Sequence, residues 1–271
     1  MDAEIIAMLG QDGVTNGAIY ALLALALVLV FAVTRVIFIP QGEFLAWGGL
    51  TMAALESGHF PATVWLLVGC GVLTLAVDGF SATGRRSIGR SLLWNLAYPL
   101  ALAGLLWGLP IAELPTAARV LIALAIVVPM GPMLYRVAFQ PVAEAPVLVL
   151  LIISVAVHLA MVGLGLLIFG PEGSRTQPFS EAQFELGSLM VGGHTLVVLA
   201  ASVVLIVALY LFFDRTLYGK ALRATAINRN GARLMGISPA LAGRLTFFLA
   251  AVIGVLSGLL VAPITTVYYD S

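Results

Sequence analysis

Long apolar stretches, separated by short polar turns, constrain this chain more than any other feature. Of its 271 residues, 61% are hydrophobic and 10% are charged, whereas an average soluble domain is roughly 45–50% apolar and about 25% charged. A water-soluble fold of this composition would lack the polar side chains to cover its surface. Because a helix needs about 20 apolar residues to cross a bilayer, the sequence predicts an all-α, polytopic membrane helix bundle.

We predict about eight transmembrane segments in a single transmembrane domain, 1–271. The full-length segments are 13–39, 62–77, 92–109, 117–135, 147–169, 196–213 and 245–267. A further segment, 44–55, is short and follows Pro40-Gln41-Gly42-Glu43. It either crosses the membrane or re-enters on the same side, and every later loop changes side with that choice.

The basic residues favour a crossing. Lys plus Arg and Asp plus Glu each number 13, which leaves no net charge and no basic surface for nucleic acid. If 44–55 crosses, then Arg85, Arg86, Arg90, Arg136 and the basic loop 214–243 share one side. Since Lys and Arg near helix ends stay cytoplasmic, we predict that loop to be cytoplasmic and both termini and the loop 171–194 to be external.

The loop 214–243 is the longest polar stretch. Its sequence favours two short helices, 220–227 and 230–235, the second of which ends at Gly236 as a C-cap. Two amphipathic helices beside the membrane suit a docking platform for a cytoplasmic partner. The alternative is a basic loop that only fixes topology. The external loop is expected to be irregular, with a small strand near 183–189.

The chain offers little for enzyme chemistry. It lacks H-E-x-x-H, C-x-x-C and G-x-S-x-G patterns. Ser154 and His158 share one helix face and would suit an intramembrane hydrolase, although hydrogen bonds within the bundle explain them better. Gly219-Lys220 is followed by alanine, so no nucleotide loop forms. We therefore predict no catalytic, cofactor or metal residues.

Charged residues within the apolar segments are scarce. Glu43 follows Pro40 and Gly42, and free backbone groups at a broken membrane helix are a recurrent way to bind polar solutes; the alternative is a solvated turn. Asp78 and Glu56 lie near predicted span ends, so we expect them to face headgroups or water. The Gly254-x-x-x-Gly258 spacing offers a smooth face for helix packing.

Four stretches, in order along the chain, resemble the permeases of branched-chain amino-acid ABC importers, a family that includes urea and short-amide permeases. Residues 16–22 resemble its N-G-x-x-Y-A-L opening, and 36–44 resemble its V-I-N-F-A-[QH]-G-E-F segment. Residues 139–146 resemble a proline turn before a long helix, and 216–237 resemble the loop that contacts the ATPase.

The resemblance implies a permease subunit of an inner-membrane importer, which has no ATP site or cofactor of its own. Its partners would be two cytoplasmic ABC ATPase subunits, a second homologous permease, an external solute-binding protein and membrane lipid. The implied ATPase-coupling residues are Thr216, Gly219, Ala221, Arg223, Ala224, Ala226, Ala232, Leu234, Met235 and Gly236. The implied substrate-pathway residues are Asn16, Tyr20, Gln41, Gly42 and Glu43. A urea or amide permease, a stand-alone secondary transporter or channel, and an intramembrane hydrolase remain alternatives.

The sequence departs from the family in several places. Phe38 and Pro40 replace the usual Asn and Ala, and Val142-Ala143 replaces Leu-Arg. Residues 62–109 match poorly. The sequence stops at 271, where relatives continue through a glycine-rich stretch and further helix, so we expect either a fragment or an unusually short copy that lacks a final helix.

Overall fold

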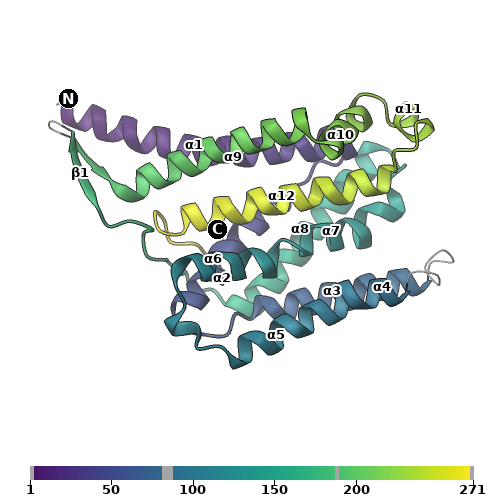
Figure 1. The fold of residues 1–271 in the computed structure, drawn as a ribbon, viewed down its shortest axis with the longest axis horizontal. Helices are drawn as coiled ribbons and strands as arrows, with labels where there is room; N and C mark the ends of the chain where they lie inside the picture. Colours follow the sequence, from purple (N-terminus) through teal and green to yellow (C-terminus); the bar gives the residue numbers. More distant parts are fainter. Residues whose placement is uncertain (1–2, 81–87, 187–188, 269–271) are drawn as a thin grey trace.

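The computed structural model describes residues 3–80, 88–186 and 189–268, and within them it is almost entirely helical (Figure 1). The helices are α1 (Ala3–Thr34), α2 (Gln41–Glu56), α3 (Thr63–Phe80), α4 (Ile88–Leu92), α5 (Tyr98–Gly108), α6 (Thr116–Val127), α7 (Met130–Leu134), α8 (Val147–Phe169), α9 (Gly193–Arg215), α10 (Leu217–Ile227), α11 (Arg229–Leu234) and α12 (Pro239–Val261). π-helical turns Leu93–Ala97 and Tyr135–Phe139 continue α4 into α5 and extend α7. Two 3₁₀ turns lie at Ile111–Glu113 and Gln140–Val142.

The described residues contain six helices that are long and apolar enough to cross a membrane. They are Met8–Thr34, Thr63–Phe80, Thr116–Val142, Val147–Phe169, Gly193–Arg215 and Pro239–Val261, with a shorter apolar helix at Leu93–Gly108. The prediction of an all-α polytopic membrane bundle is confirmed. The predicted span 92–109 is shorter than expected, although α4 precedes it without a break in the helix.

Helix α12 is the central helix of the bundle and the most buried of the six long apolar helices among the described residues. It packs against α1, α2 and α7. Glycines let α12 and α2 approach closely: a Cβ on Gly258 would overlap the carbonyl oxygen of Leu45, and a Cβ on Gly48 would lie 2.9 Å from the Cα atom of Val255. The Gly254-x-x-x-Gly258 spacing therefore lies in a helix contact, as small residues at membrane helix crossings do.

The segment between α1 and α2 turns the chain back into the bundle. Helix α1 runs from the hairpin end of the bundle towards α10 and α11 (Figure 1). The Gln41 amide then donates to the carbonyl of Ala250, halfway along α12, and α2 continues to Glu56 at the hairpin end, where Glu56 accepts from the Gln177 backbone. Residues 35–40 and α2 together lead from the α10–α11 end towards the hairpin end of the bundle, and the crossing of 44–55 stays a prediction. Irregular backbone inside a membrane bundle is tolerated where protein surrounds it, and Val36 and Phe38 are buried.

The loops fall at two ends of the bundle (Figure 1). At one end, strands β1 (Gln183–Leu186) and β2 (Leu189–Gly192) form an antiparallel hairpin, and Ser174 pairs with Val267. The single strand predicted at 183–189 is thus the first half of a hairpin. At the other end lie α10, α11 and the turn after α7. Arg85, Arg86 and residues 269–271, which entered the topology and truncation predictions, lie outside the described residues.

Candidate functional site: a helix break and a coupling segment

The break after α1 is held by hydrogen bonds to two other helices, α8 and α12. Arg35 ends α1 in the left-handed region, at φ 60°, a conformation common one residue past a helix end. The backbone N–H of Ile39 donates to Ser154 Oγ on α8, over 3.0 Å. The Gln41 side-chain amide donates to the carbonyl of Ala250 on α12, also over 3.0 Å. The first bond satisfies one backbone donor that the missing helical turn leaves free, and the second ties the start of α2 to α12.

Glu43 is buried in the first turn of α2, and its Oε1 lies 3.0 Å from His158 Nδ1 on α8. It is therefore no solvated turn residue. A carboxylate at a helix N-terminus is also favoured by the helix dipole. Ser154 and His158 do not act on each other as a hydrolytic dyad: Ser154 accepts from Ile39 and His158 contacts Glu43. Both side chains fasten α8 to the break.

Asn16 and Tyr20 lie elsewhere, on the exposed side of α1, where Tyr20 is 70% exposed. Positions 16, 20, 23 and 27 follow helical spacing and share one face. Leu23 and Leu27 on that face line a shallow apolar cavity of about 250 Å³ together with Gln41 and Gly42. Four of the five expected pathway residues thus border one strip of surface, whereas the side chain of Glu43 turns away towards His158.

Phe38 stands where the family pattern has a polar residue, and it is accommodated there by other aromatic side chains. Its ring lies 4.7 Å from that of Phe247, edge to face, and contacts Phe44 and Phe139 as well. Edge-to-face aromatic pairs add to the stabilisation from buried apolar area. An aromatic cluster of Phe38, Phe44, Phe139 and Phe247 therefore fills the space beside the break.

The segment after α9 forms the two short helices that the sequence predicts, α10 and α11. Thr216 caps α10 by accepting from the N–H of Gly219, and Asn228 caps α11 by accepting from the N–H of Gly231. A Cβ on Gly219 would overlap the carbonyl oxygen of Phe212. Gly236 follows α11 with φ 83°, a conformation that favours glycine. Local sequence therefore fixes each turn of this segment.

Both short helices are braced against the bundle. Leu222 of α10 is fully buried with Leu29 and Val33 of α1 and Ala242 of α12. In α11, Arg229 donates to the carbonyl of Ala143 and Arg233 lies 3.3 Å from Glu144. A groove of about 990 Å³ lies between α11 and this turn. Helices α10 and α11 are therefore in contact with α1, α12 and the turn before α8.

The residues expected to couple to an ATPase fall into two groups. Thr216, Gly219 and Gly236 shape the segment through the cap, close contact and turn described above. Ala232 is buried in α11, and Ala221, Ala224 and Ala226 are half-buried in α10. Arg223, Leu234 and Met235 project outward, and Leu234 and Met235 are 88% and 83% exposed. Leu217 and Ile227, which the pattern did not single out, are exposed to the same degree.

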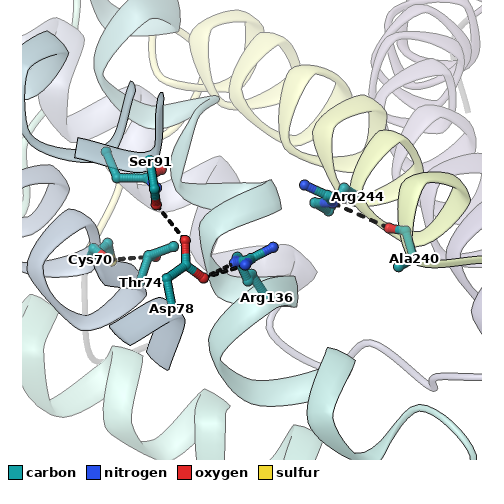
Figure 2. A network of polar contacts seen from close by, with 8 residues as sticks. Cys70, Thr74, Asp78, Ser91, Arg136, Ala240 and Arg244 are labelled. Carbon is teal, nitrogen blue, oxygen red and sulfur yellow. Dashed lines mark hydrogen bonds and ion pairs between the residues drawn. The ribbon is translucent and has the colours of Figure 1, made fainter. Parts of the chain in front are cut away.

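A buried ion pair is the main feature that the sequence interpretation missed. Asp78, expected to face headgroups or water, is buried at the end of α3, where it pairs with Arg136 and accepts from Ser91 (Figure 2). Asn95 in turn donates to Ser91. The prediction failed because the partner lies 58 residues away. Glu56 lies at the end of α2, where its carboxylate accepts a hydrogen bond from the backbone N–H of Gln177 in the loop 171–194.

In the described part of the chain, no group of three or more His, Cys, Asp or Glu side chains is arranged to hold a metal ion. The site consists of a broken helix deep in the bundle and a segment at one end whose exposed side chains include Leu234 and Met235.

The comparisons with known proteins agree with this description. Residues 11–270 match the family model described as the permease component of the branched-chain amino acid transport system. Neither the curated proteins nor the solved structures gave a match. Permease components of ABC transporters cross the membrane several times and have no ATPase site. This chain belongs to the branched-chain amino acid transport system permease family.

Proposed function

We propose that this chain pairs with a second permease subunit to form the membrane passage of an ATP-driven importer for a branched-chain amino acid or a related small solute. Two ATPase subunits would bind at the α10–α11 end, in the cytoplasm, and a solute-binding protein would deliver solute at the hairpin end. The membrane would be the inner, cytoplasmic membrane. Urea and short amides are the second candidate substrates, because the same family motifs serve them.

The geometry of the coupling segment carries this proposal. Leu217, Ile227, Leu234 and Met235 expose large apolar side chains at one end of the molecule. Apolar groups that project beside a cationic segment suit a protein partner. The opposite faces of α10 and α11 contact α1, α12 and the turn before α8. ATP-driven closure of the partner would therefore tilt the helices that flank the break.

The break would respond through α12. Gln41 hydrogen bonds to Ala250 of this helix, and Phe38 packs on Phe247 one turn earlier. A shift of α12 along its axis would strain both contacts at once and reposition the residues 37–42 beside α1. Because packed cores change between discrete arrangements, this coupling suits an alternation between two access states.

We place the solute route along the exposed strip that carries Asn16, Tyr20 and Gly42. Its polar and aromatic groups, with the apolar cavity next to them, suit an amino acid with an apolar side chain. The second permease subunit would cover this strip and exclude lipid from it. A route through the centre of this one chain has less support, because the aromatic cluster around Phe38 fills that region.

Association with the ATPase tests the coupling assignment. Met235→Asp places a charge among the exposed apolar side chains, so it should weaken co-purification of the ATPase with the full chain by at least tenfold. Met190→Asp is the matched control, since Met190 is also exposed but lies on the hairpin at the other end. Equal retention of the ATPase by both variants would contradict the assignment.

Uptake by the assembled transporter tests the route. Tyr20→Ala should lower leucine uptake while ATPase association is unchanged. Tyr210→Ala is the control, because Tyr210 is 68% exposed against 70% for Tyr20 but lies on α9. Transport that is lost equally in both variants, or in neither, would remove the support for a route along α1.

A further inference from the structure

A cavity of about 520 Å³ opens between α3, the α4–α5 helix, α7 and α12, away from the break and from the coupling segment. Its inner wall holds the polar side chains of Asp78, Ser91, Asn95, Arg136 and Arg244. Its other walls are Thr74, Trp94, Tyr98, Pro129, Pro132, Met133 and Phe248. The cavity is therefore amphipathic, with charge on one side and apolar surface on the other.

The charges in the cavity do not cancel. Asp78 is occupied by Arg136 and Ser91. Arg244 uses its Nε to donate to the carbonyl of Ala240, one turn back on α12, and among the described residues no carboxylate forms an ion pair with it. Both Arg136, which repels its charge, and Asp78, which attracts it, lie near Arg244, so two guanidinium groups share one carboxylate. Figure 2 shows both arginines facing the same space. The cavity thus has one positive charge in excess and unused N–H donors.

The cavity lies near one end of the membrane helices, at the height where lipid headgroups meet water, so a membrane lipid can reach it. Asp78 lies in the last turn of α3, Arg136 follows α7, and Arg244 lies in the second turn of α12, all at the α10–α11 end. Trp94 and Phe248 at the rim are 63% and 42% exposed on helices that membrane surrounds. Tryptophan at this level is typical of the bilayer interface. An occupant reaching the arginines would leave its apolar part beside Trp94 and Phe248.

We propose that this cavity binds the phosphate headgroup of an anionic phospholipid, with Arg244 and Arg136 as its phosphate donors and with Trp94 and Phe248 against its acyl chains. Guanidinium groups present paired donors that match phosphate oxygens, and basic pockets between membrane helices bind anionic headgroups in this way. The lipid would complete the charge balance that the protein leaves open. The site is separate from the transport route and from the ATPase contact, and it needs neither assignment to be right.

Lipid binding to the purified, delipidated full chain tests the proposal. Phosphatidylglycerol, phosphatidylcholine and inorganic phosphate would each be titrated, with bound lipid counted by native mass spectrometry and thermal unfolding followed in parallel. Phosphatidylglycerol should stay bound and raise the unfolding temperature, and phosphatidylcholine should do neither. Inorganic phosphate that competes at the same concentration would show a soluble-anion site and overturn the lipid assignment.

Variants locate the site. Arg244→Gln should weaken phosphatidylglycerol binding by about fivefold, the contribution of one basic residue near a membrane surface, and Arg244→Lys should retain most of it. Arg215→Gln is the control, because Arg215 is an exposed arginine at the same end outside the cavity. Should Arg244→Gln fail to fold, Trp94→Ala removes the apolar wall and should also lower lipid affinity. Unchanged affinity in folded Arg244→Gln or Trp94→Ala would overturn the proposal.

Discussion

Removing the carboxylate of Asp78 should destabilise the bundle more than any other single charge change in the described residues. The side chain of Asp78 is 7% exposed and that of Arg136 is 25% exposed. Breaking a buried pair costs about 3–5 kcal/mol, because the remaining charge stays buried without a partner. Arg136 keeps some access to the surroundings, so we expect Asp78→Asn to cost about 3 kcal/mol, the lower end of that range.

The assay is thermal unfolding of the full chain in detergent, by tryptophan fluorescence. At about 2–4 °C per kcal/mol, a loss of about 3 kcal/mol lowers the midpoint by about 6–12 °C. Replacing both partners, Asp78→Asn with Arg136→Gln, should recover much of that loss, since a neutral pair leaves no buried charge. A double variant that loses the sum of the two single losses would refute the reasoning.

Asp214→Asn supplies the matched control. Asp214 pairs with Arg215, but their side chains are 42% and 79% exposed. Exposed pairs contribute little, about 0–1 kcal/mol, so this variant should unfold within about 2 °C of the unmodified chain. Equal shifts for Asp78→Asn and Asp214→Asn would show that the Asp78 pair is no more buried in solution than a surface pair.

Two further predictions concern the break and the coupling segment. Ser154→Ala should lower the free energy of unfolding by about 1–3 kcal/mol, because the Ile39 N–H loses its acceptor. Ser202→Ala is the control and should be neutral, because it removes a buried hydroxyl that has no partner among the described residues. Equal unfolding midpoints for the two variants would contradict the role of Ser154. Gly219→Ala should displace α10 and reduce ATPase co-purification, because its Cβ has no space against α9; Gly17→Ala, with open space around its Cβ, should leave both stability and association unchanged.

The membrane bundle was predictable because its cause is local. A bilayer demands runs of about 20 apolar residues, and such runs are visible in the sequence. The end of α11 was predictable for the same reason, because Gly236 acts within a turn of its own position; the cap of α10 at Thr216 was not predicted, and α10 begins three residues before the predicted 220–227 helix. The segment 44–55 was harder, because a short helix that follows irregular backbone lacks the long apolar run of a full span. Hydrogen bonds to α8 and α12 hold its start in the bundle.

Side-chain partners distant in sequence were not predictable. Asp78 was assigned to headgroups or water from its place at a span end, yet Arg136 and Ser91 enclose it. Ser154 and His158 were expected to form polar contacts within the bundle, and they do, but the sequence did not identify Ile39 and Glu43 as their partners. Phe38 departs from a polar family pattern because three phenylalanines from other segments surround it. In each case tertiary packing decides the role, and no local pattern records it.

Uptake by the reconstituted complex tests the central claim most directly. The full chain would be inserted into liposomes with its permease partner and ATPase subunits, and radiolabelled leucine would be supplied on the external side with its binding protein. We predict uptake that requires ATP, stops when the ATPase is omitted, and falls in the Met235→Asp variant but not in Met190→Asp. Uptake that continues without the ATPase would contradict the account and favour a transporter or channel that works alone.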